Sequence, residues 1–219
     1  NLLPPEKLGY LWLLFSGEAL STGGSFEDIL ERSADYAADL RERLRARIYD
    51  DVVPDLAMAI ADARDLSEPD AEDLEQTYEM ALTVLYRLLF IAYAEDKELL
   101  PYRTNELYRR RSLKQKAHEL LTIKQDDGSF DRSSTHWSEF VELCRAVAGG
   151  HQEWDVPAYD GGLFSEDGSV SAVGALLADI DIPNTEFGPI LTNLLIDKTP
   201  EGPGPVDFRS LGVRAFGTI

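Results

Sequence analysis

Residues 74–94 constrain the fold most strongly, because apolar side chains occupy nearly every face of a helix built from them. A helix that is apolar on nearly all sides belongs in the buried centre of a domain. The longest apolar stretch within it, residues 80–94, is interrupted by Thr83 and Arg87 and is too short and too polar to cross a bilayer. We therefore predict a long central buried helix that ends at Pro101, and we expect no association with a membrane.

Arg87 lies inside this predicted core helix. A buried guanidinium needs a charged or hydrogen-bonded partner, because water no longer solvates it. Glu79 and Glu95 are too far along the helix to be its neighbours at i ± 4. We expect Arg87 to be largely buried and held by a carboxylate or by backbone carbonyls.

Helical periodicity also dominates the rest of the chain, and no alternation typical of a strand persists. Ser112 and either Ser134 or Thr135 are suitable helix N-caps, whereas the Pro- and Gly-rich residues 200–205 are typical of a linker. Besides the central one, helices are expected in residues 6–15, 25–48, 54–63, 112–122, 135–149, 172–178 and 184–196.

The predicted fold class is therefore mainly α, with an irregular multi-helix domain around the long central helix. We expect a helical core in residues 1–150. The loop-rich C-terminal third, residues 151–219, is expected to pack its short helices on that core.

The net charge is strongly negative, with 21 Lys and Arg against 40 Asp and Glu, a formal net charge of −19. Such a protein repels a DNA backbone on average. Arg is also more frequent than Lys, and an acidic, Lys-poor composition is typical of proteins adapted to high salt. Habitat is thus one explanation of the acidity. The N-terminus has no secretory signal pattern, so we expect a cytoplasmic protein.

Residues 97–124 differ from this background, because they carry 8 basic and 3 acidic side chains. Arg binds phosphate well through its planar guanidinium, so this basic island is a candidate DNA contact. The alternative is a solvated surface that pairs with the surrounding acids. The candidate DNA-binding residues are Arg103, Arg109, Arg110, Arg111, Lys114 and Lys116.

Composition and spacing point to no particular reaction. The three histidines are not spaced as metal ligands, and no phosphate-binding glycine loop occurs. Cys144 lies on the apolar stripe of a predicted helix, which favours a core thiol over a nucleophile. We therefore predict no catalytic residue and no metal site.

Three stretches, taken in this order, resemble the region before the methyltransferase domain in type IIG restriction–modification enzymes. Related adenine methyltransferases of the BREX and DISARM phage-defence systems are similar. The stretches are residues 85–96, 156–164 and 206–219. Within the first two, the motif residues, all with a structural role, are Arg87, Glu95, Pro157, Tyr159, Asp160, Gly161, Gly162 and Phe164.

Pro157 restricts the backbone of the second stretch, and Asp160-Gly161-Gly162 favours a tight turn. We expect this stretch to be an ordered structural segment rather than an active-site loop. Its apolar anchors, expected to be substantially buried, are Tyr159, Leu163 and Phe164.

In the family that the chain resembles, the full polypeptide uses S-adenosylmethionine to methylate adenine N6 in DNA, and some members also carry a nuclease. This sequence contains neither an Asn-Pro-Pro-Tyr-type motif nor a convincing nuclease motif. The resemblance therefore implies a connector fragment that leads to a missing methyltransferase domain. It binds no cofactor itself, whereas S-adenosylmethionine is expected in the parent protein.

We thus expect a non-catalytic helical connector that positions the methyltransferase domain, and a nuclease domain where one is present. Duplex DNA is its expected partner in the context of the parent protein, through the basic island. Two alternatives remain open. One is a purely structural or protein-interaction module with no DNA role. The other is a self-contained enzyme, which would need a pocket with convergent polar groups.

Overall fold

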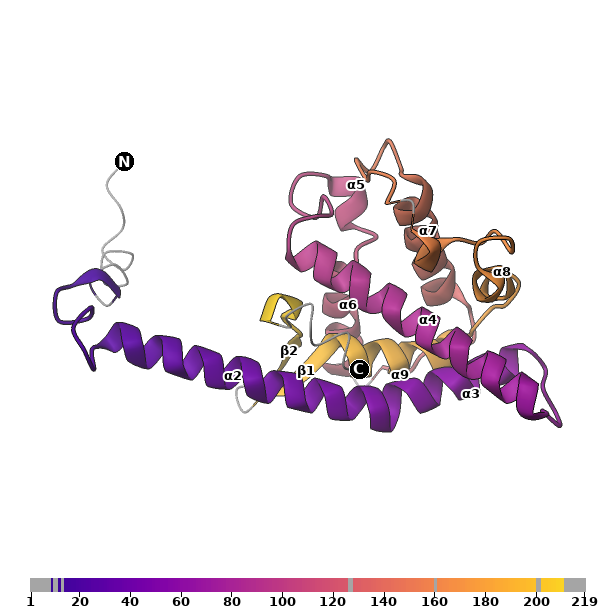
Figure 1. Ribbon diagram of the computed structural model, residues 1–219, viewed down its shortest axis with the longest axis horizontal. Helices are drawn as coiled ribbons and strands as arrows, with labels where there is room; N and C mark the ends of the chain where they lie inside the picture. Colours follow the sequence, from indigo (N-terminus) through magenta and orange to yellow (C-terminus); the bar gives the residue numbers. More distant parts are fainter. Residues whose placement is uncertain are drawn as a thin grey trace. The chain divides into compact units, whose positions relative to one another are not determined.

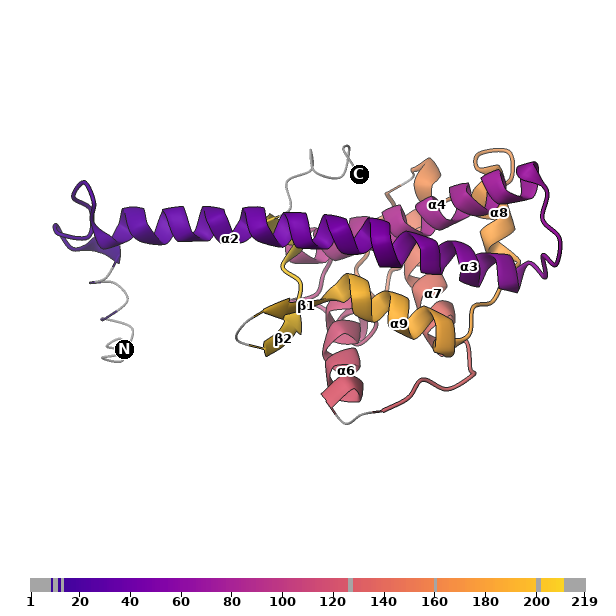
Figure 2. The same cartoon turned by 90° about the horizontal axis from the view of Figure 1, so that it is seen from below.

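The computed structural model describes residues 9, 12, 14–125, 128–159, 161–199 and 202–210. Leu44–Arg209 form one compact unit, and the described residues up to Arg43 belong to another. The fold is mainly α, as predicted (Figures 1 and 2). In chain order, its elements are α2 (Ser25–Arg47), η1 (Ile48–Val52), α3 (Val53–Ala63), α4 (Ala71–Asp96), α5 (Glu106–Arg109), α6 (Leu113–Gln125), α7 (Thr135–Gly149), η2 (Gly162–Phe164), α8 (Ala172–Ala178), α9 (Asn184–Leu195), β1 (Ile196–Thr199), β2 (Gly202–Pro205) and η3 (Phe208–Ser210).

The unit before Leu44 contains most of α2. The carboxylate of Glu27 accepts the Gly23 amide at 2.7 Å at the start of this helix. In this helix, Leu30 is 53% exposed and Tyr36 is exposed as well. The N-terminal part of α2 therefore presents apolar side chains to solvent.

In the second unit, the single π-helical turn η1 leads into α3, whose first turn contains Pro54 as predicted. α4 begins with a capping box. The Asp70 carboxylate accepts the amides of Glu72 and Asp73 at 2.9 Å, and the Asp73 carboxylate accepts the Asp70 amide at 3.3 Å. α3 and α4 pack against each other (Figure 1).

α4 is the central helix that the sequence predicts, and nearly every face of it is buried from Met80 onward. Leu74 and Tyr78, in its first turns, are exposed, so the apolar pattern there extends further than the core does. The helix ends at Asp96 rather than at Pro101. The left-handed conformation of Glu98 lets the Leu99 amide bond back to the Ala94 carbonyl at 2.8 Å.

α9 packs against α3, α6 and α7 (Figure 2). Three rings form its contact with α7: Trp137 meets Phe187 edge-on at 5.2 Å, and Phe140 lies 5.7 Å from both. The Trp137 indole donates to the Ile180 carbonyl at 2.8 Å, so its polar atom is also satisfied.

The N-terminus of α7 is capped differently from the prediction. Ser134 occupies the N-cap position, but its side chain makes no capping hydrogen bond. Asn184, from the start of α9, accepts the His136 amide at 2.9 Å instead. The Asn184 amide group also donates to the side chains of Asp131 and Ser133, which fixes its orientation.

The expectation of a linker in residues 200–205 is wrong for residues 202–205, which form a strand, while residues 200 and 201 lie outside the described residues. β1 and β2 form an antiparallel pair whose register places Ile196 opposite Pro205 and Lys198 opposite Pro203. Proline is tolerated because both members of a two-stranded pair are edge strands, where a missing N–H breaks no central ladder. The Arg47 guanidinium anchors β1 by binding the Ile196 carbonyl and the Asp197 carboxylate.

Candidate functional site

Arg87 in the middle of α4 is 4% exposed. Its Nε donates to the Leu163 carbonyl at 2.7 Å and its Nη2 donates to the Ser165 carbonyl at 3.2 Å. These are the burial and the backbone carbonyl partners that the sequence predicts. Arg87 thus ties the end of the second resembling stretch to the core helix.

Aromatic contacts add to this attachment. The Phe90 ring of α4 meets the rings of Tyr159 at 5.7 Å and Phe164 at 5.2 Å, both edge-on. The Tyr159 hydroxyl donates to the Leu99 carbonyl at 3.0 Å, and its amide donates to the Val147 carbonyl at 3.0 Å. Phe164 is buried as expected, whereas Tyr159 and Leu163 are half-buried. Two hydrogen bonds therefore hold Tyr159 in place although its side chain is only half-buried.

The glycines and the proline of this stretch lie at the surface. Pro157, Gly161 and Gly162 are exposed, and Asp160 lies outside the described residues. The glycine that lies closest to another part of the backbone is Gly174 in α8, which faces the Ser165 carbonyl. A Cβ there would overlap the Ser165 carbonyl oxygen and would lie 3.1 Å from Nη2 of Arg87. Gly174 therefore leaves room for the carbonyl that Arg87 binds.

Glu95 is 1% exposed near the end of α4. Its Oε1 accepts the Tyr108 hydroxyl at 2.8 Å and the Leu113 amide at 3.0 Å, and its Oε2 accepts the Lys114 amide at 2.9 Å. The Leu113 and Lys114 amides lie at the start of α6, where N–H groups have no partner within the helix. A carboxylate there also interacts favourably with the positive end of the helix dipole. Glu95 therefore caps α6 from a distant position in the sequence.

Burial raises the pKa of the Glu95 carboxyl to about 7, although the hydrogen bonds from Lys114, Tyr108 and Leu113 favour its ionised form. Burial, together with the Glu95 charge, also raises the pKa of the Tyr108 phenol. The Tyr108 hydroxyl therefore stays protonated and remains a hydrogen-bond donor.

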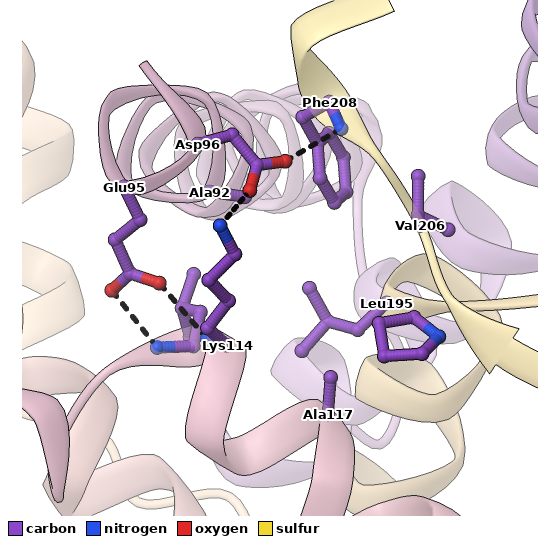
Figure 3. Close-up of a pocket in the computed structure, with 10 residues that line it drawn as sticks. Ala92, Glu95, Asp96, Lys114, Ala117, Leu195, Val206 and Phe208 are labelled. Atoms are coloured by element: carbon purple, nitrogen blue, oxygen red, sulfur yellow. Dashed lines mark hydrogen bonds and ion pairs between the residues drawn. The ribbon is translucent and has the colours of Figure 1, made fainter. Parts of the chain in front are cut away.

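Asp96, the next residue, is 5% exposed and holds two other groups. Its Oδ1 pairs with Nζ of Lys114, and its Oδ2 accepts the Phe208 amide at 2.7 Å. Figure 3 shows Asp96 between Lys114 and Phe208, with the Glu95 carboxylate directed to the backbone at the start of α6. Asp96 thereby attaches the described part of the third resembling stretch to α4. Residues 211–219 of that stretch lie outside the described residues.

Sequence reasoning identified Glu95 but missed Asp96, Tyr108 and Phe208. A signal was present, because two adjacent carboxylates in the last turn of an apolar helix face the negative end of its dipole. Such residues need dedicated donors. The sequence does not reveal which donors, because they come from α5, α6 and the segment after β2.

The six candidate DNA-binding residues do not form one free cationic surface. Each has a carboxylate partner. Arg103 pairs with Glu98 at 3.1 Å, and Arg109 and Arg110 share Glu106. Arg111 pairs with Glu142 at 2.7 Å, and Lys114 pairs with Asp96. Lys116 contacts Glu119 at 2.8 Å and Glu139 at 2.7 Å.

Exposure separates these six residues into two groups. The side chain of Lys116 is mostly buried and that of Lys114 is about one-third exposed, so both serve internal ion pairs. Arg103, Arg109, Arg110 and Arg111 are exposed enough to exchange a carboxylate for another anion. Exposed ion pairs contribute little free energy, so such an exchange costs little.

His, Cys, Asp and Glu are side chains that could ligate a metal ion or act as nucleophiles in the described residues. Within them, no group of three or more His, Cys, Asp and Glu is placed to hold a metal ion. Burial raises the pKa of the Cys144 thiol to about 12, which keeps it from acting as a thiolate nucleophile. No helix in the described part of the chain is long and apolar enough to cross a membrane.

Two hollows lie among the described residues. The one in Figure 3 lies between α4, α6 and the segment after β2, and its volume of ≈ 20 Å³ is room for about one water molecule. The other, of ≈ 220 Å³, is lined by apolar side chains together with Lys124, Thr192 and Asn193. Neither brings together an acid, a base and a nucleophile around a space that would admit a substrate.

Comparison with known proteins identifies no relative. No family model, no curated protein and no solved structure matches the chain.

Proposed function

We propose that the chain is the non-catalytic helical connector of a DNA adenine methyltransferase or restriction–modification protein. The observation that supports this proposal is the meeting of all three resembling stretches on one helix. α4 contains the first stretch, binds the second through Arg87 and Phe90, and binds the described start of the third through Asp96.

In this proposal, α4 works as a rigid support. Its buried length fixes Arg87, Phe90 and Asp96 relative to one another, because a helix held on nearly all sides cannot change their spacing. The segment after β2 would then leave the connector in a defined direction toward the methyltransferase domain. S-adenosylmethionine would bind in that domain, and adenine methylation would take place there.

The proposal includes a contact between the basic island and DNA. Arg103, Arg109, Arg110 and Arg111 could reach phosphates only by giving up Glu98, Glu106 and Glu142. Contacts of this kind position a protein on DNA and carry no sequence information. Neighbouring domains of the parent protein would raise the local DNA concentration enough to make them useful.

A specific observation also favours a second candidate, a protein-interaction module with no DNA role. In the unit before Leu44, the exposed large apolar side chains are Trp12, Phe15, Leu20, Leu30 and Tyr36. Exposed apolar clusters commonly mark contact surfaces. In this reading, the ion pairs of the basic island only neutralise an acidic surface.

The experiment that tests the proposal is expression of the complete reading frame that encodes this chain in a bacterial host without adenine methylation. We expect N6-methyladenine in host DNA at one recurrent sequence, and none when residues 1–219 are expressed alone. Absence of methylation from the complete reading frame would contradict the proposal, and so would methylation by residues 1–219 alone.

A further inference from the structure

Residues 206–209, here called the strap, follow β2 and lie against the end of α4. Val206 and Phe208 are buried and alternate with Asp207 and Arg209, which are exposed and pair with each other at 3.1 Å. The Val206 amide donates to the Leu195 carbonyl at 2.9 Å. The hydrogen bond from the Phe208 amide to Asp96 is the polar attachment of the strap to α4.

Lys114 connects this attachment to the start of α6. Its backbone amide donates to Glu95 at 2.9 Å, and its ammonium group pairs with Asp96 and lies 5.2 Å from the Tyr102 ring centre. One residue of α6 therefore contacts both carboxylates at the end of α4. A movement of the first turn of α6 changes the surroundings of both.

The small hollow of Figure 3 lies beneath the strap. Ala92, Ala117 and Leu195 line it together with Val206 and Phe208. Atoms that face a hollow lack dispersion contacts on that side, so Val206 and Phe208 make fewer such contacts there than they would at a filled site. Glu95 and Asp96 line the same hollow, and water reaches them when the strap leaves.

We propose that the strap and the first turn of α6 dock on α4 together and leave it together, with Lys114 as the residue that couples them. When the strap leaves, Asp96 loses the Phe208 amide and becomes hydrated. Its attraction for the Lys114 ammonium then weakens, because the surrounding dielectric constant rises. When the α6 turn unwinds, Asp96 loses the ammonium and keeps a buried negative charge, which disfavours the docked strap.

The joint docking of the strap and the first turn of α6 needs neither DNA nor a methyltransferase. It can therefore be tested independently of the proposed function. If the proposed function also holds, this joint docking determines whether the chain beyond the strap is held against the connector or released from it.

The test is hydrogen exchange of the Phe208, Leu113 and Lys114 amides, measured by NMR on the 219-residue chain at low denaturant concentrations. These are the amides bound by Asp96 and Glu95. We expect all three to have the same protection within about threefold and the same denaturant dependence, below the protection of amides in the centre of α4. Different denaturant dependences would overturn the proposal, as would exchange of all three only through global unfolding.

Lys114→Met removes the ammonium group but keeps the backbone amide. We expect exchange of all three amides to accelerate together by at least tenfold. The matched control is Lys116→Met in the same helix, which loses pairs with Glu119 and Glu139 and should change exchange at Phe208 by less than twofold. Acceleration of Phe208 alone would overturn the coupling. If Lys114→Met does not fold, the exchange pattern of the unmodified chain decides.

Discussion

The backbone amide of Phe208 donates a 2.7 Å hydrogen bond to the carboxylate of Asp96, 112 residues earlier in the chain. The acceptor is almost fully buried and is the last residue of α4. A helix end that carries negative charge is unfavourable by itself. The Phe208 amide and the Lys114 ammonium offset this cost, and in doing so they fix where the strap lies.

Asp96→Ala is expected to destabilise the chain by about 2–3 kcal/mol, because it leaves the buried Phe208 amide without an acceptor. Urea unfolding measures the change. The control is Glu98→Ala, which removes a carboxylate from an exposed pair with Arg103 and should cost less than about 1 kcal/mol. Equal midpoints and slopes for the two variants would contradict the importance of the buried contact.

Arg87→Ala is expected to cost about 3 kcal/mol, because the carbonyls of Leu163 and Ser165 both lose a charged donor in a buried site. Arg111→Ala removes an exposed pair with Glu142 and should cost about 0–1 kcal/mol. Both variants can be compared by urea unfolding followed by circular dichroism. If Arg111→Ala were the more damaging change, our placement of Arg87 as the anchor of α4 would be wrong.

Gly174→Ala is expected to destabilise the chain by about 1–3 kcal/mol, because the added methyl group overlaps the Ser165 carbonyl that Arg87 binds. Gly149→Ala is the matched helical control. No atom lies within 4 Å of its added Cβ, so we expect it to be neutral or stabilising by about 0.5–1 kcal/mol. Thermal unfolding of both variants gives the comparison, and a stable Gly174→Ala would contradict the close approach.

The pH dependence of stability tests Glu95. Its pKa is about 7 in the folded chain, above the ordinary value of 4.5, so the folded state holds a proton that the unfolded state releases. The resulting stabilisation is full below about pH 4 and is lost as the pH rises through 7. We therefore expect the stability of the unmodified chain, relative to Glu95→Gln, to fall by up to about 3 kcal/mol across this window.

Unfolding free energies at several pH values between 4 and 8 measure this difference, in which contributions of other groups cancel. A relative stability that rises with pH would mean that the three hydrogen-bond donors outweigh burial at Glu95.

The basic island is expected to bind DNA weakly. Because each phosphate contact contributes a slope of about −0.9 in log K against log salt, a few arginines give a shallow slope. Substitution of Arg109, Arg110 and Arg111 by Ala should weaken duplex binding without changing thermal stability by more than a few degrees, since their pairs are exposed. Fluorescence anisotropy at several salt concentrations checks this. Unchanged DNA affinity with lowered stability would assign the cluster a structural role.

The sequence predicts the parts of this structure that follow from local periodicity. The apolar faces of α4 place Arg87 in the core, and the bounds of α7 and α8 follow from apolar spacing and from Gly149 and Gly150. Burial alone then requires partners for Arg87. The partner carbonyls belong to Leu163 and Ser165, which reach α4 only through the tertiary fold. Sequence periodicity does not predict that contact.

The missed features share this origin. Asn184 caps α7 from the start of α9. Glu95, at the end of α4, adds to the cap of α6 that the predicted Ser112 hydroxyl makes with the Gln115 amide at 3.1 Å, so these two contributions are distant in sequence. The Gly-Pro-Gly-Pro segment of β2 has no strand alternation and forms a strand because it pairs with β1, which Arg47 anchors. Tertiary contacts decide the structure at each of these places.

The central claim is that α4 positions the segment leading to a methyltransferase domain, and the Asp96→Ala variant of the complete protein tests it most directly. We predict at least a tenfold lower rate of adenine methylation than for the Glu98→Ala control, with unchanged binding of S-adenosylmethionine by calorimetry. A wild-type methylation rate for Asp96→Ala, while hydrogen exchange at Phe208 shows that the strap has detached, would contradict the claim.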